Sequence, residues 1–102
     1  MLAAMLEELG HRVAGEAGSI GKACLMAETA EYNLAMLDIN LSGHDVGPVA
    51  EIIAERGLPI LFVTGYASAA LPNGFDDKPV IQKPFVLTKL RDVVEVALSD
   101  RA

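Results

Sequence analysis

The chain has 102 residues, a hydrophobic content of 52% and a net charge of −6. This length favours a single domain with its own core. No apolar run approaches the ~18 residues that cross a bilayer, and the acidic balance argues against a nucleic-acid partner. Cys24 is the single cysteine, so no internal disulfide can form. Because no basic stretch or cleavage site marks a signal peptide, we expect a cytoplasmic protein with no membrane partner.

The hydrophobic pattern alternates between helical and strand spacing, which is typical of an α/β fold with a parallel sheet. Helical spacing starts at Leu2 and stops at Gly10. The later helices are expected to follow a Ser19 cap, to run from Gly47 and Pro48 to Gly57, and to follow a Thr88 cap. Short apolar runs predict strands at 12–17, 34–38, 59–64 and 80–82. The segment 65–77 is harder to assign and holds about one helical turn at 67–71.

Three of these expected strands end in a polar residue, namely Asp38, Thr64 and Lys83. Ligands of open α/β sheets gather beyond the carboxyl ends of the strands. A carboxylate there can act as a nucleophile, a hydroxyl can donate to phosphoryl oxygens, and an ammonium can balance their charge. The three side chains together therefore predict a site for phosphoryl transfer.

The chain resembles a receiver domain of the two-component response regulators over essentially all of its length. The motifs that carry the resemblance are Leu37-Asp38-Ile39-Asn40-Leu41-Ser42-Gly43, Phe62-Val63-Thr64-Gly65-Tyr66 and Gln82-Lys83-Pro84-Phe85. The resemblance implies a flavodoxin-like, doubly wound parallel sheet with the strand order 2-1-3-4-5. It also implies that residues 1–102 form one receiver domain of the single-domain type.

The resemblance also implies a role for each residue of the site. Asp38 matches the aspartate that accepts the phosphoryl group, Thr64 the hydroxyl that moves onto it, and Lys83 the lysine that pairs with Asp38. The remaining matches are the backbone carbonyl of Asn40 as a magnesium ligand beside Asp38, the amides of Asn40 and Gly65 as phosphate donors, and a cis peptide bond between Lys83 and Pro84. Many receivers carry an aromatic residue two positions before the lysine, where this chain has Ile81, and we expect Tyr66 to take over part of the signalling motion.

The chain departs from this family at its start, because Met1 already lies inside the pattern of the first helix. The family's first strand and the acidic pair at its end have no counterpart, and Glu7 and Glu8 lie at the wrong end of the helix to replace the pair. Magnesium favours carboxylate oxygens, so we expect weak or absent magnesium binding. The missing strand leaves a slot between 12–17 and 34–38, and unpaired edges need cover. We therefore expect a homodimer or a rearranged sheet.

The sequence leaves three functions open. The first is a stand-alone receiver that takes a phosphoryl group from a histidine kinase or a histidine phosphotransfer protein and signals to a downstream protein. The second is a degenerate receiver that binds its partners without phosphorylation. The third is a phosphatase similar to the haloacid-dehalogenase superfamily, but there the acidic pair follows the lysine, whereas Asp76 and Asp77 precede Lys83. We therefore do not expect an enzyme.

Overall fold

The computed structural model describes residues 2–39, 45–65, 71–72 and 74–99. Three strands form one parallel sheet in the order β1-β2-β3, which confirms the predicted α/β architecture. The elements, in chain order, are α1 (Leu2–Glu8), α2 (Ile20–Thr29), β1 (Ala35–Asp38), α3 (Gly47–Glu55), β2 (Ile60–Thr64), β3 (Val80–Gln82) and α4 (Leu87–Ser99). Among these described helices, none has the length and apolar character that a membrane crossing requires.

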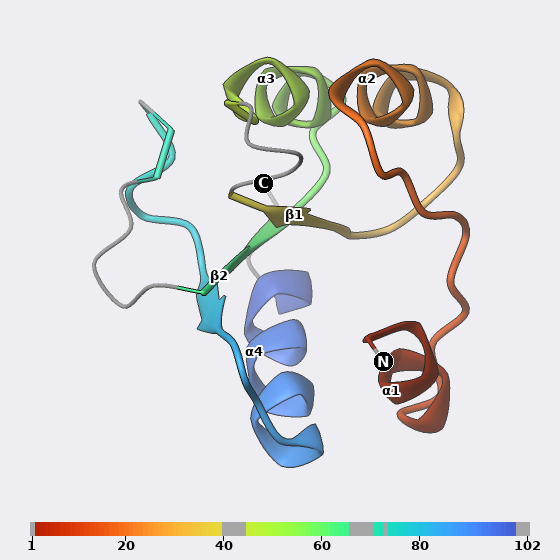
Figure 1. The fold of residues 1–102 in the computed structure, drawn as a ribbon, viewed down its shortest axis with the longest axis vertical. Helices are drawn as coiled ribbons and strands as arrows, with labels where there is room; N and C mark the ends of the chain where they lie inside the picture. Colours follow the sequence, from red (N-terminus) through yellow and green to blue (C-terminus); the bar gives the residue numbers. More distant parts are fainter. Residues whose placement is uncertain (1, 40–44, 66–70, 73, 100–102) are drawn as a thin grey trace.

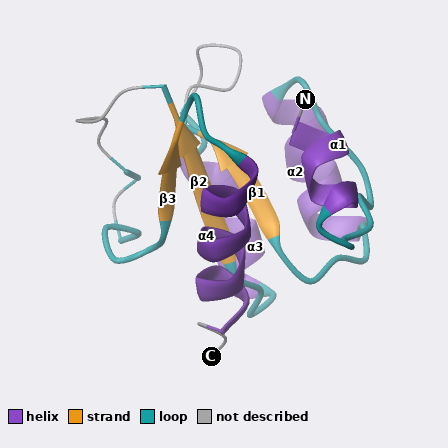
Figure 2. Ribbon diagram, turned by 90° about the horizontal axis from the view of Figure 1, so that it is seen from below, coloured by secondary structure: helices purple, strands orange, loops and turns teal. Residues whose placement is uncertain are grey.

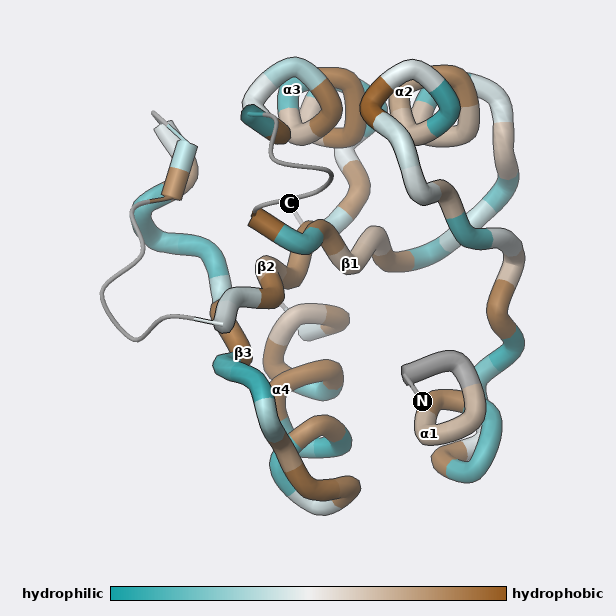
Figure 3. Tube along the Cα trace, in the orientation of Figure 1, coloured by the Kyte–Doolittle hydropathy of each residue, from teal (hydrophilic) through white to brown (hydrophobic). Residues whose placement is uncertain are grey.

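Helices cover both faces of the sheet, as a doubly wound fold requires. Figure 1 shows α2 and α3 side by side over one face, with α4 and α1 on the other side, and Figure 2 shows α4 lying along the strands. The central strand β2 is buried at every position. Its apolar side chains alternate between two clusters, because successive side chains of a strand point to opposite faces. Figure 3 shows the resulting run of hydrophobic residues through β1 and β2.

We call these clusters the α2/α3-side cluster and the α4-side cluster. Ile60 and Phe62 belong to the first, together with residues of α2 and α3. The second contains Leu61, Val63, Ile81, Leu90, Val94 and Ala97, and partly buried residues of α1 pack against it. Burial on both faces explains why β2 is a continuous apolar run rather than an alternating one.

Most of the predicted helix ends are confirmed. The Ser19 side chain accepts a hydrogen bond from the backbone N–H of Lys22 at 3.3 Å and so caps α2. Gly10 and Gly57 adopt φ values of 93° and 73°, a conformation that glycine reaches without steric cost, and they follow the ends of α1 and α3. The predicted cap at Thr88 is wrong. The helix α4 begins one residue earlier, and the Leu90 N–H bonds the carbonyl of Val86 at 3.1 Å.

The predicted strand at 12–17 is also wrong, because this segment forms no strand. Val13 and Ala17 are half-buried, whereas the other four residues of the segment are exposed. A strand needs a partner for its backbone groups, and the described residues place no strand beside this segment. The hydrophobic pattern of 12–17 is therefore not enough to form a strand when no neighbouring strand is available for pairing.

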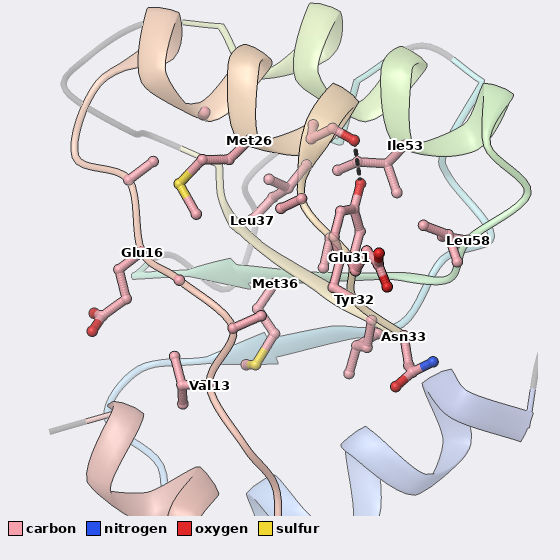
Figure 4. A pocket seen from close by; sticks show the side chains of 18 of the residues that line it. Val13, Glu16, Met26, Glu31, Tyr32, Asn33, Met36, Leu37, Ile53 and Leu58 are labelled. Carbon is pink, nitrogen blue, oxygen red and sulfur yellow. Dashed lines mark hydrogen bonds between the residues drawn. The ribbon is translucent and has the colours of Figure 1, made fainter.

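The slot expected between 12–17 and 34–38 is present as an open groove of about 1230 Å³. One of its walls is the edge of β1 that faces away from β2, and another is the extended segment 11–17. Figure 4 shows Val13 and Glu16 on that segment and Met36 and Leu37 on β1. Among the described residues, no strand pairs with this edge of β1.

Candidate functional site

The parallel register brings the ends of the three strands to one edge of the sheet. Asp38, the last residue of β1, is paired with Val63 of β2, and Thr64 is paired with Gln82, the last residue of β3. Lys83 therefore lies one residue beyond the end of β3. The three polar residues predicted from the sequence thus follow one another diagonally across the carboxyl edge.

Asp38 and Lys83 meet at this edge although β2 lies between their strands. Nζ of Lys83 donates a hydrogen bond to Oδ2 of Asp38 at 2.8 Å. Adjacent strands lie ~4.8 Å apart, so a side chain must span ~10 Å to cross the middle strand. Both residues lie on the face of the sheet that carries the α4-side cluster. Asp38 is two positions after Met36, and Lys83 is two positions after Ile81, and residues two apart in a strand share a face. A long side chain on the correct face is what makes the predicted contact possible.

This ion pair remains open to solvent. The side chain of Lys83 is 52% exposed and that of Asp38 is 37% exposed. A carboxylate with this exposure is within reach of a phosphodonor. The ammonium beside it places one positive charge where the added phosphoryl group would bring negative charge.

Thr64 lies at the end of β2, between the two charged residues, and is only 5% exposed. Its carbonyl oxygen accepts a hydrogen bond of 2.7 Å from the backbone N–H of Lys83, which ties that lysine to the middle strand. Gly65 follows at an exposed position, where an added Cβ would meet no atom within 4 Å. Asn40 and Tyr66, the other two predicted site residues, lie outside the described residues.

The segment after β3 has the backbone geometry that the resemblance implied. The peptide bond between Lys83 and Pro84 is cis, as expected. Phe85 follows at a half-buried position and packs against the α4-side cluster. Lys83 is thus close in sequence to residues that are anchored in the core.

Magnesium requires several oxygen ligands in octahedral geometry. The described residues contain no group of three or more His, Cys, Asp or Glu side chains that could hold a metal ion. At the site, one oxygen of the Asp38 carboxylate is bound to the ammonium of Lys83. The described residues therefore do not form a magnesium-binding set by themselves.

Two contacts near the sheet were not predicted from the sequence. Asp45 accepts a hydrogen bond from the N–H of Gly47 at 2.9 Å and so stabilises the start of α3. Nη1 of Arg56 donates to the carbonyl oxygens of Ala27 and Ala30 at 2.7 and 2.8 Å and joins the ends of α2 and α3. An Asp two residues before a helical Gly-Pro is a recognisable turn signal. The arginine bridge joins residues far apart in sequence and has no motif.

Comparisons with known proteins give one consistent result. The transcriptional regulatory protein PdtaR of Mycobacterium tuberculosis is 30% identical over 96% of this chain and 50% of its own length. The chain therefore spans about half the length of the curated relatives it matches. No protein-family model matches the chain.

Solved structures extend this result to the fold. SdrG from Sphingomonas melonis Fr1 has a TM-score of 0.84 at 33% identity, with 96% of this chain and 83% of SdrG covered. A response regulator receiver protein from Sinorhizobium medicae WSM419 has a TM-score of 0.78 at 27% identity, with 97% and 83% covered.

A further structure bears on the fold alone. The receiver domain of the sensor histidine kinase PA1611 from Pseudomonas aeruginosa has a TM-score of 0.76 at 23% identity, with 97% and 86% covered, and it holds a magnesium ion in its active-site cleft.

SdrG has also been solved in a BeF3-activated conformation, with a TM-score of 0.78 at 33% identity and with 95% of this chain and 83% of SdrG covered. With its strand order, its polar residues at the carboxyl edge and these similarities together, the chain belongs to the receiver domains of the response regulators.

Proposed function

We propose that this chain is a receiver that accepts a phosphoryl group on Asp38 and signals by binding another protein. The observation that carries the proposal is the 2.8 Å contact between Lys83 and a half-exposed Asp38 at the carboxyl edge of the sheet. A carboxylate that is reachable from solvent and paired with a cation is suited to attack a phosphorus atom and to hold the product.

In the proposed reaction, an oxygen of Asp38 forms a bond to phosphorus as the bond between phosphorus and the donor's imidazole nitrogen breaks. The product is an acyl phosphate on Asp38, and the freed imidazole takes up a proton. Lys83 then balances the negative charge of the phosphoryl group, while the Thr64 hydroxyl and the Gly65 amide are proposed as its hydrogen-bond donors.

Magnesium is proposed to assist the transfer without being firmly bound by the protein. Bound there, it would neutralise charge on the transferred phosphoryl group. We propose that Asp38 and the carbonyl of Asn40 contribute the protein ligands and that binding is weak, because the described residues contain no group of three or more His, Cys, Asp or Glu side chains that could hold a metal ion. We therefore expect the rate of phosphorylation to rise with magnesium only at high concentrations of the ion.

The partners are proposed on the same basis. A histidine kinase or a histidine phosphotransfer protein would supply the phosphoryl group, and a downstream protein would read the modified state. We propose a cytoplasmic location, where such partners would be encountered. We also propose a homodimer. The groove beside β1 supports it, because that edge carries backbone groups that a second copy can pair with.

One assay tests the phosphoryl-acceptor proposal. The chain is incubated with acetyl phosphate and magnesium, and its intact mass and the labelled peptide are measured. We expect one added phosphoryl group that is labile to base, maps to Asp38 and is lost in Asp38→Asn. Labelling that persists in Asp38→Asn would reject the site.

A second observation favours the alternative, a degenerate receiver. The described residues contain no group of three or more His, Cys, Asp or Glu side chains that could hold a metal ion, whereas the family's acidic pair and aspartate together form such a group. Beryllofluoride separates the two functions without any turnover. A phosphoryl acceptor is expected to shift the amide resonances of residues 38, 64 and 83 when beryllofluoride is added. A degenerate receiver would leave those resonances unchanged and would still bind its partner.

A further inference from the structure

The ion pair between Lys83 and Asp38 does not fix its own geometry. Both side chains are exposed to a large extent, 52% and 37%. Exposed pairs of this kind contribute little, because water screens the attraction and a long side chain loses conformational freedom in forming them. The position of the Lys83 ammonium must therefore depend on how firmly the backbone at residue 83 is held.

That backbone lies at the end of the shortest strand of the sheet. β3 has three residues and lies at the edge of the described sheet, so it pairs with β2 alone. One backbone hydrogen bond ties residue 83 itself to the sheet, from its N–H to the carbonyl of Thr64. Lys83 and Pro84 are both exposed. Side chains on either side of this pair must supply the remaining anchorage.

Two apolar side chains do so, each two residues from Lys83. Ile81 is 1% exposed and belongs to the α4-side cluster, and it holds β3 from within the strand. Phe85, which follows Lys83 in the sequence, packs against the same cluster but belongs to neither β3 nor α4. Its packing is thus the contact that places the irregular segment between the strand and the helix.

We propose that Phe85 is a positioning residue, which holds the backbone around Lys83 so that the ammonium reaches Asp38. This inference rests on the proposed phosphoryl-acceptor function. A smaller side chain at position 85 would free the segment 83–86 to shift relative to β2. The ammonium would then no longer lie against the carboxylate, although both charges would still be present.

The test compares Phe85→Ala with Phe85→Leu and with Val86→Ala as the matched control. Val86 is the next residue and is 66% exposed, so its truncation removes a side chain from the same segment without removing packing. We expect Phe85→Ala to slow labelling by acetyl phosphate about tenfold at saturating donor, since small misplacements near a reacting group have large effects on rate. Phe85→Leu should recover most of the rate, and Val86→Ala should match the unmodified chain.

A double-mutant cycle distinguishes positioning from general loss of structure. If Phe85 acts through Lys83, then Phe85→Ala should have little further effect on labelling in a Lys83→Ala background. If the two effects on the labelling rate simply multiply, Phe85 acts independently of Lys83 and the proposal is overturned. Urea unfolding of each variant establishes that the labelled molecules are folded, and Phe85→Val takes the place of Phe85→Ala in the cycle if the alanine variant does not fold.

The same inference can be tested even if the chain proves not to be phosphorylated. The ¹³C resonance of the Asp38 carboxyl reports on its ammonium neighbour, and it can be measured without any donor. We expect Phe85→Ala to move this resonance toward its position in Lys83→Ala, while Val86→Ala leaves it in place. An unmoved resonance in a folded Phe85→Ala variant would contradict the positioning role, whatever the outcome of the labelling assay.

Discussion

The expected effect of Lys83 on the phosphorylation of Asp38 can be separated from its effect on the free energy of folding. The side chain is exposed over half of its surface, and its charged partner is more than a third exposed. An ion pair in this setting contributes about 0–1 kcal/mol to folding. The same charge is expected to have a much larger effect on the rate of phosphorylation, because it stabilises the negative charge of the transferred phosphoryl group.

We therefore expect Lys83→Met to lower the free energy of unfolding by less than about 1 kcal/mol, while phosphorylation of Asp38 slows by about tenfold or more. Labelling rates and urea unfolding curves measure the two effects. Lys89→Met is a suitable control, because Lys89 is an exposed lysine of α4. A fall in labelling of equal size in the control would show that the effect is one of net charge rather than of position.

Gly65 allows the backbone and side-chain roles of a site residue to be separated. An added Cβ at this position meets no atom within 4 Å, and the position is exposed. The proposed role belongs to the amide, which alanine retains. We expect Gly65→Ala to change the free energy of unfolding by no more than about 0.5 kcal/mol and to keep labelling close to that of the unmodified chain. A large loss of labelling would mean that the donor must approach more closely than a methyl group permits.

Among the elements, the strands were the most predictable from the sequence where an apolar run was present. The runs at 34–38, 59–64 and 80–82 become β1, β2 and β3 with little or no shift. The run at 59–64 is the clearest of them, because β2 is buried at every position and burial on both faces requires a continuous apolar stretch. The segment 12–17 was mispredicted because strand formation depends on a neighbour rather than on composition alone. The resemblance predicted the contact between Asp38 and Lys83, whereas the spacing of 45 residues between them cannot do so.

The connection between α2 and α3 could not be predicted, because it depends on one arginine. Arg56 donates to the carbonyl oxygens of Ala27, in the last turn of α2, and of Ala30, directly after that helix. Its guanidinium lies 4.9 Å from the centre of the Tyr32 ring. The hydroxyl of Tyr32 donates to one of the same carbonyls, that of Ala27, at 2.6 Å. Arg56 precedes β2 and Tyr32 precedes β1, so this cluster lies at the amino edge of the sheet, away from Asp38.

We expect Arg56→Met to lower the free energy of unfolding by about 1–2 kcal/mol, because charge-assisted hydrogen bonds are lost. Labelling of Asp38 should be unaffected. Tyr32→Phe should lower the free energy of unfolding by less, and the double variant should show less than the sum, because both side chains bond the carbonyl of Ala27. Additive losses would show that the two contacts are independent, and a change in labelling would show that the amino edge is coupled to the site.

For the whole molecule, we expect the groove beside β1 to decide the oligomeric state. The N–H groups of Ala35 and Ile39 donate to the carbonyls of Pro59 and Val63, on the side of β2. Because successive N–H groups of a strand point to opposite sides, the N–H of Met36 points away from β2. Met36 lines the groove in Figure 4. A second copy that pairs with this edge would need that N–H group.

We expect sedimentation to show a dimer that Met36→Pro weakens more than Met36→Ala does. Proline removes the outward N–H and is tolerated at a strand edge, whereas alanine keeps the N–H and removes a similar amount of side chain. Equal effects of the two variants would show that the dimer does not use this backbone group. A chain that sediments as a monomer at all concentrations would exclude the dimer.

The separation of the two charged residues also has a consequence during synthesis. Residue 83 leaves the ribosome long after residue 38, and the lysine reaches its partner only when β3 has joined the sheet. Non-local contacts of this kind carry the entropy cost of closing a long loop before they form. On the proposed function, a nascent chain that exposes Asp38 without Lys83 would be a poor phosphoryl acceptor, and we expect phosphorylation to begin only after β3 has joined the sheet.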